Sequence, residues 1–342
     1  MKVTLRDIAD RANVSISSVS RALKHDASTA PVHDQTRLRI IQAAKELGYH
    51  KVKLAVQKNE TEKRIGLVMH LVKNKYNDPY FSEIMYGIES ELIEQGCVLD
   101  FTFEVKDVSD LDLFSDMDLH GLGVLCVGPV KPALLRKVSK QVPFVFSVGG
   151  LLLPDLDCVT VDFRRAAKEA VQHLIRLGHR EIAFIGGCSL VAPTLEQEER
   201  FVGYREALAS FGIPLTEAWI GNGGWDLTQS YEAMLKMLQA DKRPTAVFVS
   251  SDKMAYGAYK AIQACELSIP EDISVMSFDD VEMSEFMSPG LSTVRVHKEE
   301  MGRIAVKLLI QRMEGNIRLR LNTVLPTELI VRGSCKESTS LS

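Results

Sequence analysis

Apolar positions repeat with a helical period near the start of the chain and as short continuous runs later. The first two helical stripes consist of Leu5, Ile8, Ala9 and Ala12, followed by Val19, Ala22 and Leu23. Asn13-Val14-Ser15 separates them. Asn tolerates the left-handed backbone that closes a helix, and Ser is a good N-cap for the next helix. Residues 3–23 are therefore predicted to form a helix-turn-helix.

The second of these helices has an unusual exposed face. It presents small, hydroxylated or cationic side chains, namely Ile16, Ser17, Ser18, Ser20 and Arg21. A helix that faces only solvent normally carries Glu and Lys, whereas a helix in the major groove needs slim side chains, hydroxyls for phosphates and an Arg for a guanine edge. The pattern indicates DNA binding. The alternative is an ordinary helical hairpin in a small domain.

Charge is distributed unevenly and supports the first interpretation. Residues 1–58 hold 11 Lys or Arg and 5 Asp or Glu, although the whole chain has a net charge of −4. A basic head on an acidic body suits a protein that docks on DNA by one end. A third helix is predicted at 34–47, with Asp34 as its N-cap and Gly48 as its stop. The polar, basic stretch 49–63 is predicted to be a linker.

From residue 64 the apolar runs are typical of buried parallel strands. They cover 65–71, 98–103, 122–127, 144–148, 159–161, 182–185, 246–249 and 273–278. Helical patterns alternate with them at 81–95, 165–177, 198–211, 228–238, 254–265 and 299–313. This alternation predicts doubly wound α/β sheets. The length of the segment favours two lobes, with a break near 158–162.

Composition excludes several classes of protein. The six cysteines are scattered singly, so neither a zinc site nor a disulfide framework is expected, and a reducing cytoplasm fits. No stretch is typical of a signal peptide or of a membrane-spanning helix. Searches for His-Glu-x-x-His, Gly-x-Ser-x-Gly and phosphate-binding motifs find none, so neither catalysis nor a cofactor is expected.

Several landmarks together resemble the lactose/galactose repressor family. Besides the head, they are HLIRLGHREIAFIGG at 173–187, RFVGYREAL at 200–208, PTAVFVSSDKMAYGAYKAI at 244–262, IPEDISVMSFDD at 269–280 and PGLSTVRVHKEEMG at 289–302. The likeness covers nearly the whole chain and is greatest to sugar-responsive galactoside repressors. It implies a DNA-binding head and a body like a periplasmic sugar-binding protein, with two lobes joined by crossovers near 160–163, 295–298 and 322–327.

The resemblance also implies domain boundaries. The head is expected at 1–48, the hinge at 49–63, and a ligand-binding and dimerisation domain at 64–342. The first lobe is expected to comprise about 64–160 and 298–322, and the second about 163–295 and 327–334.

The resemblance assigns roles within the head. Ile16, Ser17 and Arg21 occupy base-reading positions, and Thr4, Ser15, Ser18 and Ser20 are expected to hold phosphates. Ile16 is alternatively a core residue.

The linker departs from the family pattern. Tyr49 and Ala55 match it, but Lys58 replaces the leucine that relatives wedge into the minor groove, and a lysine makes a poor apolar wedge. Leu54 and Val56 are the alternative wedges.

An effector site is expected between the lobes, where strand ends face each other. Sugars are held by an aromatic face and by carboxylates or Arg on their hydroxyls. The candidates of these types are Tyr80, Phe81, Arg200, Trp225, Ser251, Asp252 and Asp279. Each also has an ordinary structural alternative. Tyr80 and Phe81 could be core residues, Arg200 a surface ion pair, Trp225 a surface residue, and Asp252 or Asp279 a helix cap.

The sequence thus predicts a cytoplasmic transcriptional regulator and not an enzyme. We expect a repressor of a sugar-utilisation operon, acting as a homodimer on operator DNA and switched by a small sugar, and the resemblance implies a galactoside. The alternative is a regulator controlled by a protein corepressor or acting as an activator. A more remote alternative is a sugar-metabolising enzyme.

Overall fold

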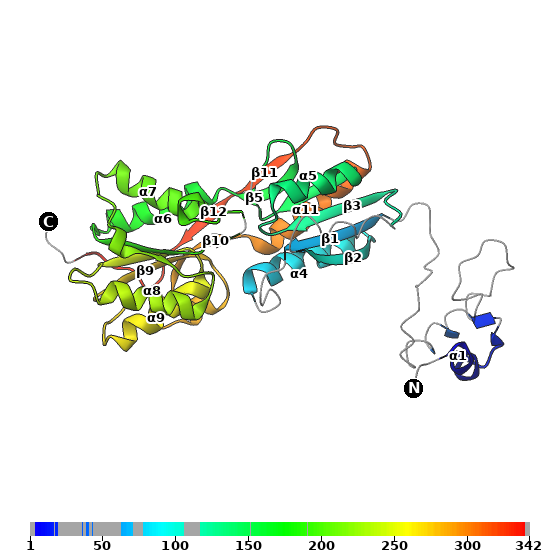
Figure 1. Cartoon of the computed structure of the whole chain (residues 1–342), viewed down its shortest axis with the longest axis horizontal. Coiled ribbons are helices and arrows are strands. Elements are labelled where there is room, and N and C mark those ends of the chain that lie inside the picture. Colours follow the sequence, from blue (N-terminus) through cyan, green and yellow to red (C-terminus); the bar gives the residue numbers. More distant parts are fainter. Residues whose placement is uncertain are drawn as a thin grey trace. The chain divides into compact units, whose positions relative to one another are not determined.

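The computed structural model describes residues 4–16, 18–19, 36, 39–40, 43, 63–70, 78–105, 117–150, 152–189 and 191–338 (Figure 1). The chain divides into two compact units, residues 1–62 and 63–342. No helix in the described ranges is long and apolar enough to cross a membrane.

The first unit begins with α1 (Leu5–Ala12), and its two ends show why the sequence forms a helix there. Thr4 Oγ1 accepts a hydrogen bond from Asp7 N, while Asp7 Oδ2 accepts one from Thr4 N at 2.7 Å, which makes a capping box. Asn13 ends the helix with φ 51°, in the left-handed region. Ser18 N then donates to Ser15 Oγ at 3.1 Å, as expected when Ser15 caps the next helix.

A small core holds this unit together. Its buried members are Ile8, Ala9, Ala12, Val19, Ile40 and Ala43. Ile40 and Ala43 are helical and belong to the region of the predicted third helix. Most of the predicted segment 34–47, and the whole predicted linker except Lys63, lie outside the described residues. The predicted helix-turn-helix head is confirmed for the part that is described.

The second unit contains two six-stranded sheets built to the same plan. The first consists of β1 (Arg64–His70), β2 (Val98–Val105), β3 (Leu122–Val127), β4 (Phe144–Val148), β5 (Asp157–Val161) and β11 (Asn322–Leu325), in the order β2-β1-β3-β4-β5-β11. The second consists of β6 (Ile182–Gly186), β7 (Ile220–Asn222), β8 (Ala246–Val249), β9 (Ser274–Asp279), β10 (Ser292–Val296) and β12 (Thr327–Ile330), in the order β7-β6-β8-β9-β10-β12. All strand pairs are parallel except β10 with β12.

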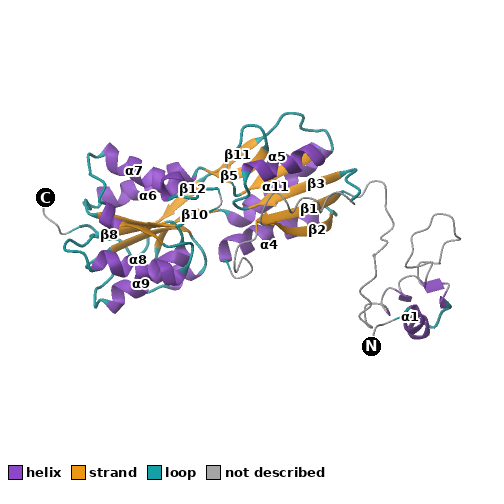
Figure 2. Ribbon diagram, viewed as in Figure 1, coloured by secondary structure: helices purple, strands orange, loops and turns teal. Residues whose placement is uncertain are grey.

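Helices cover both sheets and bury the central strands. The first lobe has α4 (Pro79–Glu94), α5 (Pro132–Gln141) and α11 (Lys298–Met313). The second has α6 (Phe163–Arg176), α7 (Glu199–Ser210), α8 (Leu227–Leu238), α9 (Asp252–Ala264) and the short α10 (Met283–Phe286), with single 3-10 turns at Leu195–Gln197 and Glu217–Trp219. Figure 2 shows α6 and α7 on one face of the second sheet and α8 and α9 on the other. The predicted doubly wound α/β body is confirmed.

The chain passes between the lobes three times. The passages lie between β5 and α6, between β10 and α11, and between β11 and β12. They fall at residues 161–163, 296–298 and 325–327. Because of the third passage, one short stretch of chain supplies an edge strand to each sheet.

Candidate functional site

Polar side chains near the carboxyl ends of the parallel strands include three residues predicted to bind a ligand, Tyr80, Arg200 and Asp279, and two that were not predicted, Ser147 and Ser250. In open α/β sheets, ligands bind beyond these ends, where the strand order reverses. In the first lobe, Tyr80 opens α4 and Ser147 lies in β4. In the second lobe, Arg200 opens α7, Ser250 follows β8 and Asp279 ends β9.

Within the described part of the chain, most of the buried side-chain atoms without a hydrogen-bond partner lie in this region, the others being His173 Nε2 on α6 and Asp280 Oδ1. Those in this region are Tyr80 Oη, Ser147 Oγ, Arg200 Nε, Ser250 Oγ and Asp279 Oδ1. A buried polar atom left without a partner destabilises a fold, and such atoms are rare. Five of them on the strand-end segments of both lobes indicate groups that await the polar atoms of a ligand.

Three of these residues lie near one another. The charges of Asp279 and Arg200 both act on the Tyr80 phenol, whose pKa is raised above its ordinary value, chiefly by burial. The Arg200 guanidinium lies 4.7 Å from the ring centroid of Phe278, the residue that directly precedes Asp279. Tyr80 of the first lobe is thus close enough to Arg200 and Asp279 of the second lobe for their charges to act on its phenol.

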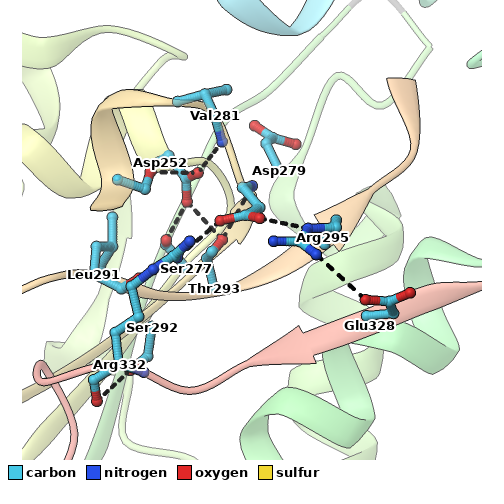
Figure 3. Close-up of polar contacts among 12 residues, drawn as sticks. Asp252, Ser277, Asp279, Val281, Leu291, Ser292, Thr293, Arg295, Glu328 and Arg332 are labelled. Carbon is cyan, nitrogen blue, oxygen red and sulfur yellow. Dashed lines mark hydrogen bonds and ion pairs between the residues drawn. The ribbon is translucent and has the colours of Figure 1, made fainter. Parts of the chain in front are cut away.

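Asp279 has the features of a functional carboxylate. It is 6% exposed, and burial raises its pKa well above the ordinary value, with Arg200 acting in the opposite direction. Its backbone adopts φ 111°, a region that side-chain-bearing residues rarely occupy. Lys298 Nζ donates to its carbonyl oxygen at 2.7 Å and helps to fix that backbone. In Figure 3 the Asp279 side chain points away from the surrounding hydrogen bonds.

Asp252 has to be removed from the predicted effector-binding residues. It is fully buried, and its two oxygens accept four hydrogen bonds inside the second lobe (Figure 3). Oδ1 accepts from Ser277 Oγ and from Thr293 Oγ1. Oδ2 accepts from Val281 N at 2.8 Å and Ser284 Oγ at 2.7 Å. Asp252 is also not the helix cap that was its alternative, because Ser251 caps α9.

The segment after β8 contains a residue that the sequence interpretation missed. Ser251 Oγ accepts from Met254 N at 3.3 Å as the N-cap of α9, so its predicted ligand contact has to share this hydroxyl. Ser250 is completely buried, and its hydroxyl has no partner. Its position directly after the apolar run 246–249 was the available signal.

Arg200 and Trp225 form an aromatic and cationic wall. The Arg200 guanidinium lies 4.3 Å from the Phe163 ring centroid and 5.4 Å from that of Trp225. Trp225 Nε1 donates to Cys188 O at 3.0 Å. The indole also packs so closely on Gly187 that a Cβ there would lie 2.5 Å from Nε1. Trp225 is thus half-buried and fixed beside Arg200.

Tyr80 and Phe81 were each predicted to be either a ligand-binding or a core residue. Their rings meet edge to face with centroids 5.3 Å apart. Both rings pack against the core, Phe81 also lies close to Gly128, and the Tyr80 hydroxyl is buried without a partner. Phe81 therefore supports the wall of the site, and Tyr80 offers a hydrogen-bonding group.

In the head, the described residues agree with an exposed reading surface. The Ile16 side chain is 47% exposed, so it is not a core residue. Ser15 Oγ and Ser18 Oγ are hydrogen-bonded to each other at 2.8 Å, and Thr4 Oγ1 donates to Asp7 Oδ2 at 2.7 Å. Ser17, Ser20, Arg21, Leu54 and Ala55, which were also predicted to contact DNA, lie outside the described residues.

Two family models match the chain in separate segments. Residues 4–51 match the model described as bacterial regulatory proteins, lacI family. Residues 171–335 match the model of a periplasmic binding protein-like domain.

Curated relatives match along nearly their whole length. The chain is 34% identical to the HTH-type transcriptional repressor MelR of Bacillus subtilis (strain 168), with 97% of each chain covered. It is 30% identical to the ribose operon repressor of Escherichia coli (strain K12), with 97% of this chain and 99% of that repressor covered.

Solved structures agree with these matches. The transcriptional regulator CelR in its cellobiose complex is 27% identical, with a TM-score of 0.70 and coverage of 97% of this chain and 99% of that one. The Lac repressor dimer bound to operator and an anti-inducer has a TM-score of 0.72 at 24% identity, covering 98% of this chain and 100% of that one, and shows the shared fold.

Proposed function

Because the chain belongs to the LacI family of bacterial regulatory proteins, we propose that it represses a sugar-utilisation operon and responds to a small sugar held between its lobes. The chain is a DNA-binding transcriptional regulator of a family that is not enzymatic. The observation that carries the sugar proposal is the set of partnerless buried polar atoms at the strand ends of both lobes. The narrower likeness to galactoside repressors stays a prediction.

We propose the following contacts for the sugar. Its hydroxyls donate to Asp279 Oδ1, and one of its oxygens accepts from Arg200 Nε. Tyr80, Ser147 and Ser250 supply further hydroxyl contacts, Ser251 shares its hydroxyl with the helix cap, and a C–H face of the sugar rests on Trp225. The raised pKa of Asp279 supports this arrangement, because a donor from the ligand would compensate a carboxylate that burial now disfavours.

On the DNA side, we propose that a homodimer places two heads on a pseudo-palindromic operator in the cytoplasm. Residues 1–48 form the head, 49–63 the hinge and 64–342 the body. Ile16, Ser17 and Arg21 read bases, Thr4, Ser15, Ser18 and Ser20 hold phosphates, and Leu54 and Ala55 contact DNA from the hinge. The exposure of Ile16 supports the first of these roles.

Switching requires the sugar to bind one arrangement of the lobes better than another, since a ligand shifts an equilibrium only by its differential affinity. A sugar that contacts Tyr80 of the first lobe as well as Arg200 and Asp279 of the second favours the arrangement in which the lobes are closed on it. Closure would then change the pairing of the first lobes and the geometry of the hinges.

Operator affinity measured with and without a library of sugars, at one stated salt concentration, tests this function. We expect at least one sugar that binds the body to change operator affinity. Sugars that bind without changing operator affinity would contradict the switch. If no sugar binds, a protein corepressor becomes the better explanation.

A further inference from the structure

Glu198 lies next to the proposed effector site and has both carboxylate oxygens engaged. It is the N-cap of α7 and only 5% exposed. Oε2 accepts from Phe201 N at 3.0 Å, and Oε1 accepts from Arg200 Nη1 at 2.8 Å. The first contact starts the helix, while the second holds the guanidinium that faces the site.

The surroundings make this ion pair strong enough to matter for binding. The Arg200 side chain is 11% exposed and the Glu198 side chain 6% exposed. The aromatic rings of Phe163, Phe278 and Trp225 lie around the guanidinium. Charges interact more strongly where water is excluded. Glu198 therefore compensates the charge of Arg200 and leaves Nε as a buried donor without a partner.

Two further cations near the site, both within the part of the chain that the structure describes, are compensated as well. Lys253 Nζ lies 3.3 Å from Asp78 Oδ2, and Lys298 Nζ lies 3.3 Å from Glu83 Oε2. Lys298 also donates to two backbone carbonyls, those of Asp279 and Asp280. Arg200, Lys253 and Lys298 thus each have a carboxylate partner, whereas Asp279 Oδ1 has no hydrogen-bond partner and remains an acceptor.

This distribution of charge disfavours an anionic ligand. Recognition of a carboxylate or phosphate relies on an Arg whose charge and paired N–H groups are available. Here the charge of Arg200 is already compensated, and a second anion would lie close to both Asp279 and Glu198. Like charges placed together in a desolvated site repel each other strongly and weaken binding. Neutral hydroxyl groups avoid this repulsion, because they donate to Asp279 and accept from Arg200 Nε.

We infer that Glu198 is a specificity-determining residue: by occupying Arg200, it makes the site accept neutral polyhydroxylated molecules and reject carboxylated or phosphorylated sugars. The inference rests on the proposed function, since it concerns the ligand of the same site. Glu198 would thus exclude acidic sugars without contacting the neutral sugar that binds.

Isothermal titration of the full-length protein with matched sugars tests the inference. One series comprises galactose, galacturonate and galactose 6-phosphate, and the other comprises glucose, glucuronate and glucose 6-phosphate. For the series whose neutral member binds, we expect the acidic members to bind the wild type about tenfold more weakly or worse. An acidic member that binds the wild type as tightly as its neutral counterpart would overturn the inference.

Glu198→Gln tests the residue itself. The amide has the same size as the carboxylate and keeps an oxygen for Phe201 N, but it removes the charge beside Arg200. We expect the affinity for the acidic sugars to rise about tenfold or more, while that for the neutral sugar changes less than about threefold. Glu199→Gln is the matched control, because Glu199 is exposed and adjacent; it should leave the ratio of acidic to neutral affinity unchanged.

The outcomes separate this inference from the proposed function. A folded Glu198→Gln protein, checked by its melting temperature, with an unchanged ratio of affinities would refute the role of Glu198. An acidic sugar that binds the wild type best and also shifts operator affinity would refute the inference but leave the sugar-switched repressor standing. Failure of every sugar to bind would refute both.

Discussion

At the scale of single residues, three consecutive positions after β8 show how the backbone divides roles that look alike in sequence. Ser250 has a buried hydroxyl without a partner, Ser251 caps α9, and Asp252 accepts four hydrogen bonds inside the lobe. The sequence places all three at a strand end, but it does not contain the local backbone directions that decide which side chain faces a ligand. Asp279 was identifiable because it ends a strand and belongs to a recognisable landmark.

Replacement of Asp279 by Asn is expected to weaken binding of the effector sugar about 10- to 100-fold, because it removes a charge-assisted hydrogen bond of about 1.5–3 kcal/mol. Operator affinity without sugar should stay near that of the wild type. Calorimetry and operator titration measure the two effects. Unchanged sugar affinity in Asp279→Asn would remove this carboxylate from the site.

The effect of Asp279→Asn on the stability of the fold should depend on pH. Because burial raises the pKa of Asp279 in the folded state above its value of 3.8 in the unfolded chain, Asp279 destabilises the fold increasingly as pH rises through the folded-state pKa. Asp279→Asn should therefore melt at a higher temperature than the wild type near neutral pH. The gap should close as the pH is lowered towards about 4. A gap that widens on acidification would contradict the assignment.

At the scale of elements, the strands with long apolar runs were predictable, including the edge strand β2, whereas the interior strand β10 and the short strands β7, β11 and β12 were not. The runs at 122–127, 144–148 and 246–249 match β3, β4 and β8 because these strands are almost entirely buried and, apart from Gly123 and Ser147, consist of apolar residues. β7, β11 and β12 have three or four residues, and β11 and β12 lie at sheet edges with alternating or partial exposure. Such strands are defined by the neighbours they pair with, which a local pattern does not contain.

The packing of α4 on α11 depends on glycine. A Cβ at Gly87 would collide with the carbonyl group of Glu299, and one at Gly302 would collide with the carbonyl oxygen of Ile84. Gly87→Ala is therefore expected to lower the free energy of unfolding by about 1–3 kcal/mol, because the two helix backbones must separate. Urea denaturation measures this. Glu89→Ala, at an exposed position of the same helix, is the control and should have a much smaller effect.

At the scale of the whole molecule, the two lobes of the body are linked by charge as well as by chain. Lys253 from α9 in the second lobe and Asp78 before α4 in the first lobe form an ion pair of 3.3 Å. Both side chains are half-buried, at 27% and 19% exposure. A contact of this kind helps to hold the two lobes in the arrangement that the structure shows.

Lys253→Met is expected to weaken sugar binding modestly, by up to about fivefold, because a partly exposed ion pair contributes up to about 1 kcal/mol. Asp78→Asn should cause a similar loss, and the double variant should lose little more, as expected for two partners of one interaction. Lys236→Met, on the exposed surface of α8, is the control. Fully additive losses would show that the two residues act independently.

The left-handed backbone at Asp279 also limits how this protein can be converted into a sensor for another sugar. Only Gly, and to a lesser degree Asn or Asp, adopts a positive φ readily, so a mutant library at position 279 would consist mostly of strained and poorly folded proteins. Ser147 and Ser250 have no such positive φ, although both are buried, so replacements there have to fit the space available. Libraries aimed at these two serines should therefore yield more folded variants, and new ligand preferences should be sought there first.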